Sequence, residues 1–111
     1  MEESERLTID ALAVTAGDTS QHAFRITPTG EIDVETAPKL DAAFDALIES
    51  GASIVVLDAS SIEFIDSTGL RSVVAAGNKL SARGGRLLIE GMSGAVQRVL
   101  EVTGLLDRYR D

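Results

Sequence analysis

The stretches Ile54-Val55-Val56-Leu57-Asp58 and Asp66-Ser67-Thr68-Gly69-Leu70 decide the fold of this chain. The first is a continuous run of apolar, mostly β-branched residues, which predicts a central strand covered on both faces. The second opens a helix, because apolar residues recur after it at helical spacing. This apolar stripe consists of Leu70, Val73, Val74, Gly77 and Leu80. Another apolar strand follows at 86–90, and the order strand–helix–strand predicts parallel neighbours joined by a right-handed crossover.

The N-terminal part of the chain adds two further strands. Residues 7–15 and 21–27 predict a hairpin, because turn-forming residues at 16–19 separate two apolar stretches. Residues 29–33 are expected to form a short loop, and residues 1–6 a flexible N-terminus.

A first helix is expected between the hairpin and the central strand. Thr36 can act as its N-cap, with Pro38 in the first turn, where a missing N–H costs nothing. Gly51 stands where a left-handed residue would end the helix. Its apolar stripe is Leu40, Phe44, Leu47 and Ile48.

The C-terminal part repeats the alternation of helix and strand. Gly84-Gly85 ends the second helix, and Ser93 can cap a third helix that closes at Gly104. Residues 105–109 are expected to pack as a short final turn or helix. The order β-β-α-β-α-β-α predicts an α/β fold. Its mixed sheet combines an N-terminal hairpin with parallel strands, its helices pack mainly on one face, and residues 7–111 form a single domain.

The composition of the chain argues against several classes of function. The chain has 111 residues, 44% of them hydrophobic, and a net charge of −8. An acidic surface repels phosphate backbones and anionic lipid, so we expect neither nucleic acid nor membranes as direct partners. With no Cys and one His, a common zinc site is not expected, and neither is a cofactor. The polar, acidic start lacks the features of a signal peptide, so a cytoplasmic protein is expected.

Ser67 is the residue whose position most clearly suggests a chemical role. It stands at an expected helix start, where free N–H groups and the helix dipole tolerate a phosphate. Asp66 would add to that negative charge, and Gly69 would keep the surface bare for a partner. Ordinary N-capping explains Asp-Ser-Thr before a helix equally well, and from the residues alone it is the commoner explanation.

Two motifs resemble the STAS domain family, in particular the bacterial anti-sigma factor antagonists. Thr29-Gly30-Glu31-Ile32-Asp33 is similar to the family's T-G-E-[LI]-D segment, and Phe64-Ile65-Asp66-Ser67-Thr68-Gly69-Leu70 to its F-[IM]-D-S-[ST]-G-L segment. Gly84-Gly85 and Gly104-Leu105 also fit the family pattern. The resemblance covers roughly residues 8–109, nearly the whole chain.

The resemblance implies a phosphate-controlled binding protein. Such proteins hold an anti-sigma factor that is also a serine kinase with an ATPase-type fold, and thereby free a sigma factor. The kinase phosphorylates the serine after the motif's Asp, which is Ser67 here, and the phosphorylated form lets go until a serine phosphatase resets it. The partner-binding residues carried over, with two motif neighbours added, are Asp33, Asp66, Thr68, Gly69, Leu70 and Arg71.

Some of these assignments have alternatives. Arg71 stands where many relatives have a small residue. It can pair with an acidic partner residue or with the phosphate, but a solvated helix charge is the plainer interpretation. Thr68 is a second conceivable acceptor, although its place in the first turn favours a structural role.

The function also has alternatives. The chain could be a STAS-type scaffold or sensor component without a phosphate switch. A small hydrolase is not favoured, because Ser67 lies outside any G-x-S-x-G elbow. We therefore expect a binding protein rather than an enzyme, and a monomer.

Overall fold

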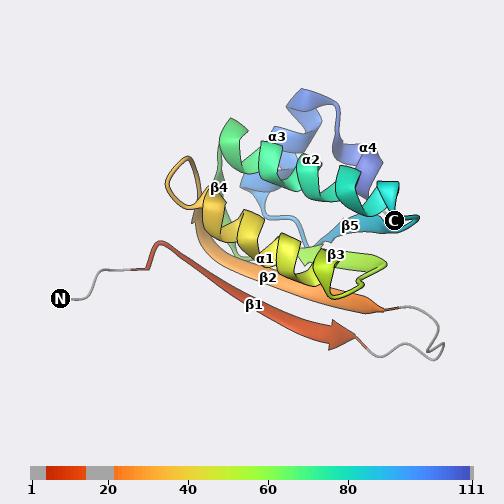
Figure 1. Ribbon diagram of the computed structural model, residues 1–111. Coiled ribbons are helices and arrows are strands. Elements are labelled where there is room, and N and C mark those ends of the chain that lie inside the picture. Colours follow the sequence, from red (N-terminus) through yellow and green to blue (C-terminus); the bar gives the residue numbers. More distant parts are fainter. Residues whose placement is uncertain (1–4, 15–21, 111) are drawn as a thin grey trace.

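Strand β2 (Ala23–Ile32) is the hub of the sheet (Figure 1). The computed structural model describes residues 5–14 and 22–110. One edge of β2 pairs with an antiparallel strand, and its other edge pairs in turn with two parallel strands. A fifth strand continues the sheet in parallel beyond β3. The other strands are β1 (Leu7–Val14), β3 (Ile54–Asp58), β4 (Ile62–Ile65) and β5 (Arg86–Glu90).

The helices lie together on one side of this sheet (Figure 1). They are α1 (Ala37–Glu49), α2 (Ser67–Ala82), α3 (Gly94–Thr103) and α4 (Leu106–Tyr109). The predicted fold class is therefore confirmed: a mixed sheet made of an N-terminal antiparallel pair and parallel strands, with helices on one face. The expected short helix at the end is α4.

The central strand β3 is covered on one face only, so the expectation of cover on both faces is wrong. Val55 and Leu57 are fully buried under the helices, whereas Ile54, Val56 and Asp58 are half-buried. On the uncovered face, Arg25 of β2 pairs with Asp58 and with Glu90 of β5. A run of apolar residues can thus occupy a strand that buries only alternate side chains.

Strand β4 is an element that the sequence analysis missed. The segment between β3 and α2 was expected to contain no strand, yet Ile62–Ile65 pairs with the end of β2. Its burial pattern, buried at both ends and exposed in between, lacks the alternation of a strand, and its pairing with β2 shifts register between Gly30 and Glu31. A strand of four residues with this pattern carries too little signal to be recognised.

The expected loop at 29–33 is also wrong, because β2 continues to Ile32. Pro28 and Gly30 are residue types typical of turns, yet both are compatible with the strand here. The Gly30 N–H donates to the Ser61 carbonyl at 3.1 Å, so the nitrogen of Pro28, two residues earlier, faces the same edge. There β2 passes from its pairing with β3 to its pairing with β4, and no ladder bond is lost.

The ends of the helices largely follow the sequence. Ser93 Oγ accepts from the Val96 N–H at 3.3 Å, as expected of an N-cap. Of the glycines predicted to end helices, Gly51, Gly84 and Gly104 have positive φ angles, and Gly85 does not. The expected turn at 16–19 lies outside the described residues. Of the expected flexible terminus, Glu5 and Arg6 are described, and both form ion pairs. Within the described part of the chain, no helix is long and apolar enough to cross a membrane.

Gly30 is a position where the fold tolerates no side chain. Its φ is +123°, and a Cβ there would lie 2.1 Å from the carbonyl oxygen of Arg6, the residue directly before β1. Gly30→Ala is therefore expected to lower the free energy of unfolding by about 3 kcal/mol, measured by urea denaturation. Gly94→Ala is the matched control, since no atom lies within 4 Å of a Cβ there, and it should leave stability nearly unchanged. Equal midpoints for the two variants would contradict this account of β2.

Candidate functional site

The first turn of α2 presents Ser67 to solvent. Asp66 is the N-cap, with an extended backbone, and its Oδ1 accepts from the Gly69 N–H at 3.0 Å. Ser67 is the first helical residue and is exposed, and its hydroxyl makes no hydrogen bond to any described residue. Asp66 therefore caps the helix, as ordinary N-capping predicts, and the hydroxyl of Ser67 takes no part in that cap.

The turn from β4 to α2 is fixed to the end of β2. The Asp66 N–H donates to the Ile32 carbonyl at 3.1 Å. Gly69 is buried behind this bond, where a Cβ would lie 2.6 Å from Ile32 Cγ2 and 2.9 Å from Ile65 Cγ1. The expectation that Gly69 keeps the surface bare is therefore wrong: its missing side chain lets the helix approach the two strand ends.

Asp33 holds the loop from β2 to α1. Its Oδ1 accepts from the backbone N–H groups of Glu35 at 3.0 Å and Thr36 at 3.2 Å. Thr36 is the N-cap residue of α1, as expected, but its side chain does not cap the helix, because its hydroxyl donates to the Glu31 carbonyl at 2.7 Å instead. The aspartate takes the N–H groups that precede the helix, and the threonine closes the turn behind it.

Arg6 binds three carboxylates of this loop. Its guanidinium contacts Glu31 at 2.8 Å and Glu35 at 2.7 Å, and it also pairs with Asp33. The hydrogen bond from Arg6 is the main cause that holds the pKa of the Asp33 carboxyl below its usual value. The sequence analysis missed this cluster. The signal lay in the strand register, because Leu7 pairs with Gly30 and so brings Arg6 beside Glu31.

The structure divides the predicted phosphorylation site and partner-binding residues into two groups. Ser67 and Arg71 are exposed, and Asp33, Asp66 and Thr68 are partly exposed at the same corner. Gly69 is buried and Leu70 packs against the core, so these two shape the corner from below.

Two exposed apolar side chains stand on the segments that flank this corner. Phe64 of β4 is 48% exposed, and Val34, directly after Asp33, is 71% exposed. Single exposed apolar residues are common on protein surfaces, and Leu12 and Val102 are as exposed elsewhere, so Val34 and Phe64 are of interest only because of their place beside this corner. The sequence analysis did not include Val34 or Phe64 among the binding residues, because periodicity alone does not show which apolar residues fail to reach the core.

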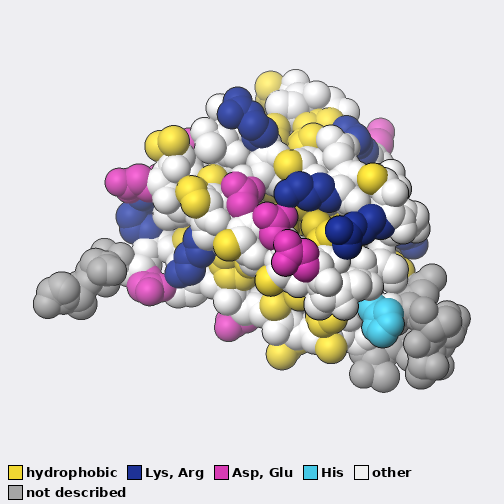
Figure 2. Space-filling model, in the orientation of Figure 1, with side chains coloured by type: hydrophobic (Ala, Val, Ile, Leu, Met, Phe, Trp, Pro, Cys, Tyr) yellow, Lys and Arg dark blue, Asp and Glu magenta, His cyan; other side chains and the backbone are white. Residues whose placement is uncertain are grey.

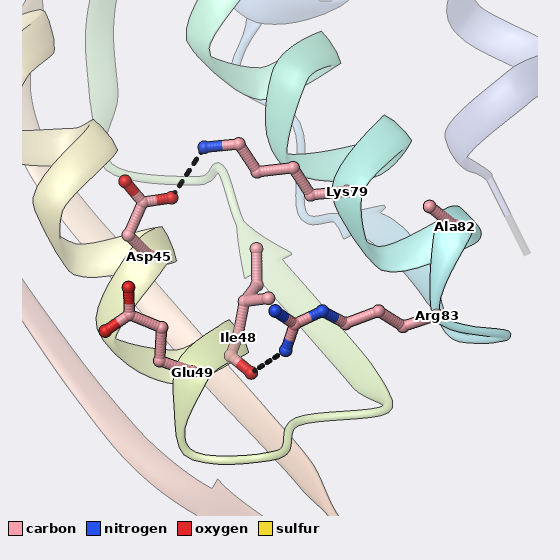
Figure 3. A pocket seen from close by; sticks show the side chains of 6 residues that line it. All are labelled: Asp45, Ile48, Glu49, Lys79, Ala82 and Arg83. Atoms are coloured by element: carbon pink, nitrogen blue, oxygen red, sulfur yellow. Dashed lines mark hydrogen bonds and ion pairs between the residues drawn. The ribbon is translucent and has the colours of Figure 1, made fainter.

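A hollow of about 260 Å³ lies between α1 and the first turns of α2. It is lined by Asp41, Thr68, Arg71, Ser72 and Ala75. A second hollow, of about 370 Å³, lies near the other end of α2 (Figure 3). There Lys79 Nζ pairs with Asp45 at 2.8 Å, and Arg83 donates to the Ile48 carbonyl at 3.0 Å. These bonds tie α1 to α2, so the second hollow has a structural explanation.

Charges of both signs are spread over the helix face (Figure 2). Acidic and basic side chains are interspersed there rather than gathered into one field. Among residues 5–14 and 22–110, no three His, Cys, Asp or Glu side chains are grouped so that they could hold a metal ion.

Comparison with known proteins places this chain in one family. The chain belongs to the STAS domain family: the family model described as "Mlab, STAS domain" matches residues 15–107. An anti-sigma-B factor antagonist of Listeria monocytogenes is 36% identical over 78 residues, covering 70% of this chain and 68% of the relative. The antagonist of the same name from Staphylococcus aureus is 29% identical over 89 residues, covering 80% and 82%.

Solved structures agree on the fold. The unphosphorylated anti-sigma factor antagonist SpoIIAA superposes with a TM-score of 0.77 at 21% identity, covering 94% of this chain and 86% of that chain. An anti-sigma factor antagonist from Mycobacterium paratuberculosis gives a TM-score of 0.71 at 28% identity, covering 92% and 83%. The phosphorylated form of SpoIIAA matches as well, with a TM-score of 0.73.

The Arg6 cluster makes stability depend on pH. Because Arg6 lowers the pKa of Asp33, the ionised carboxylate stabilises the fold above its unfolded-state pKa, and this contribution is lost as the pH falls through the lower folded value. Urea denaturation from neutral pH down to about pH 3 should therefore show a steeper loss for the wild type than for Arg6→Gln. Arg98→Gln, an exposed position on α3, should retain the wild-type slope. Parallel curves for the wild type and Arg6→Gln would contradict the assignment.

Proposed function

We propose that this protein is an anti-sigma factor antagonist controlled by phosphorylation of Ser67. In the unphosphorylated form it binds an anti-sigma factor that is also an ATP-dependent serine kinase, so that a sigma factor is freed. Phosphorylation of Ser67 releases the partner, and a serine phosphatase restores the binding form. In this proposal the chain acts in the cytoplasm, as a monomer and as a substrate rather than as an enzyme.

The free, exposed hydroxyl of Ser67 carries the proposal. It stands on the first residue of α2, outside the hydrogen bonds that hold this corner together. A kinase can therefore reach the hydroxyl without opening the fold. The relatives named anti-sigma-B factor antagonists support the general role, and the exposed Val34 and Phe64 supply apolar contact area beside it.

The transfer itself is simple in chemical terms. Ser67 Oγ forms a bond to the γ-phosphorus of ATP, the bond to the leaving ADP breaks, and the hydroxyl proton passes to a base of the kinase. The product carries about −1.5 to −2 charges at neutral pH. Asp66 is its neighbour in the chain, and Asp33 lies at the strand end that is bonded to Asp66. A partner surface that covers this corner would have to desolvate all of these negative charges, which weakens binding.

The proposal predicts how substitutions at Ser67 change partner binding. Wild type and Ser67→Ala should capture the same kinase from a lysate of the native host, and Ser67→Glu should not. With the captured partner purified, Ser67→Glu should bind more than about a hundredfold more weakly, corresponding to about 3 kcal/mol in a titration.

Ser81→Glu is the matched control. It adds the same charge to an exposed serine of the same helix, near the opposite end from Ser67, and should bind like the wild type. If Ser67→Glu and Ser81→Glu bind equally well, the phosphate switch is wrong. The chain would then be a constitutive STAS-type scaffold.

A further inference from the structure

We propose that Arg71 receives the phosphate of Ser67 within the same helix, so that phosphorylation adds an anion and at the same time removes a free cation from the binding surface. This inference rests on the proposed function, because it concerns the phosphorylated form of that site. It goes beyond it by giving the phosphate a specific partner inside this chain.

The first argument is the spacing of the two residues. Ser67 and Arg71 are the first and fifth residues of α2, and both are exposed. Residues four apart in an α-helix lie on the same face, with their Cβ atoms about 5–6 Å apart. An arginine side chain spans that gap, and its planar guanidinium can offer two parallel N–H groups to phosphate oxygens.

The second argument is that Arg71 is free to move. It forms no ion pair and no hydrogen bond with the part of the chain that the structure describes. Most other basic side chains do hold such a partner, among them Arg6, Arg25, Lys39, Lys79 and Arg83. The hollow of about 260 Å³ that Arg71 lines gives the guanidinium room to turn. Pairing with a phosphate therefore breaks no existing contact.

The surrounding charges leave Arg71 as the available cation. Asp66 precedes the phosphate, Asp33 lies on the adjoining loop, and Asp41 of α1 lines the hollow opposite. Arg6, the other cation of this corner, is already bound to three carboxylates. The carboxylates disfavour the second ionisation of the phosphate, and Arg71 favours it.

The pair would change what a partner meets. Before phosphorylation, Arg71 is an exposed cation one helical turn from Ser67, and it can receive an acidic group of the partner. After phosphorylation its charge is matched by the phosphate. Release then has two causes that act together: repulsion from the new anion and loss of the contact to Arg71.

The second ionisation of the phosphate tests the pair directly. Phosphoserine is encoded at position 67 of the full chain, and its ³¹P signal is followed by NMR through a pH titration. A phosphoserine ordinarily has this pKa near about 6. We expect the Arg71→Gln form to titrate about 0.3 pKa unit higher than the wild type, because the neighbouring cation is gone. Arg98→Gln should titrate like the wild type, and Arg71→Lys should keep part of the shift.

Identical titration curves for the wild type and Arg71→Gln would overturn the proposal, as would a curve for Arg71→Lys that coincides with that of Arg71→Gln. The phosphate is installed without a kinase, so this outcome is separate from the fate of the proposed function. If Ser67→Glu failed to weaken partner binding, the proposed function would fall, yet the NMR comparison would still decide whether Arg71 holds the phosphate.

Discussion

The rest of the site depends on the hydrogen bond from the Asp66 N–H to the Ile32 carbonyl. It ties the end of β2 to the start of α2, and Gly69 closes the angle behind it because any side chain there would strike Ile32 and Ile65. Asp66 then caps the helix with its carboxylate. These hydrogen bonds fix the corner without the hydroxyl of Ser67, which remains exposed on its surface. That is the condition under which a phosphate can change the surface and leave the fold intact.

The same corner is braced from outside by charge. Arg6 connects the chain just before β1 to three carboxylates around the β2–α1 loop, and Asp33 in turn orders the backbone before α1. Asp33 therefore binds both Arg6 and the backbone before α1, and in the proposed function its part in partner binding is to hold the loop that carries Val34. The polar groups position the surface, whereas Val34 and Phe64 offer apolar area for contact.

Much of the fold could be predicted because strong local signals agree with one another. The stripe of α2, the cap at Ser93 and the glycines that end helices all depend on residues close in sequence. The failures depend on distant residues. Pro28 and Gly30 signal a turn, and only the change of partner along β2 makes them compatible with a strand. The prediction that Gly69 lies on the surface failed because the residues that bury it, Ile32 and Ile65, belong to two strands outside its own helix. The Arg6 cluster needs the β1–β2 register, which no local pattern supplies.

The central claim is that the phosphate on Ser67 alone decides whether the partner stays bound. The most direct measurement is a time course of intact mass and complex size, in which the purified complex with the captured kinase receives ATP. The account predicts one added phosphoryl group, located on Ser67 by fragmentation, and release of the partner at the same rate as its addition. A complex that persists with Ser67 fully phosphorylated would contradict the claim, and so would release that proceeds unchanged in the Ser67→Ala variant.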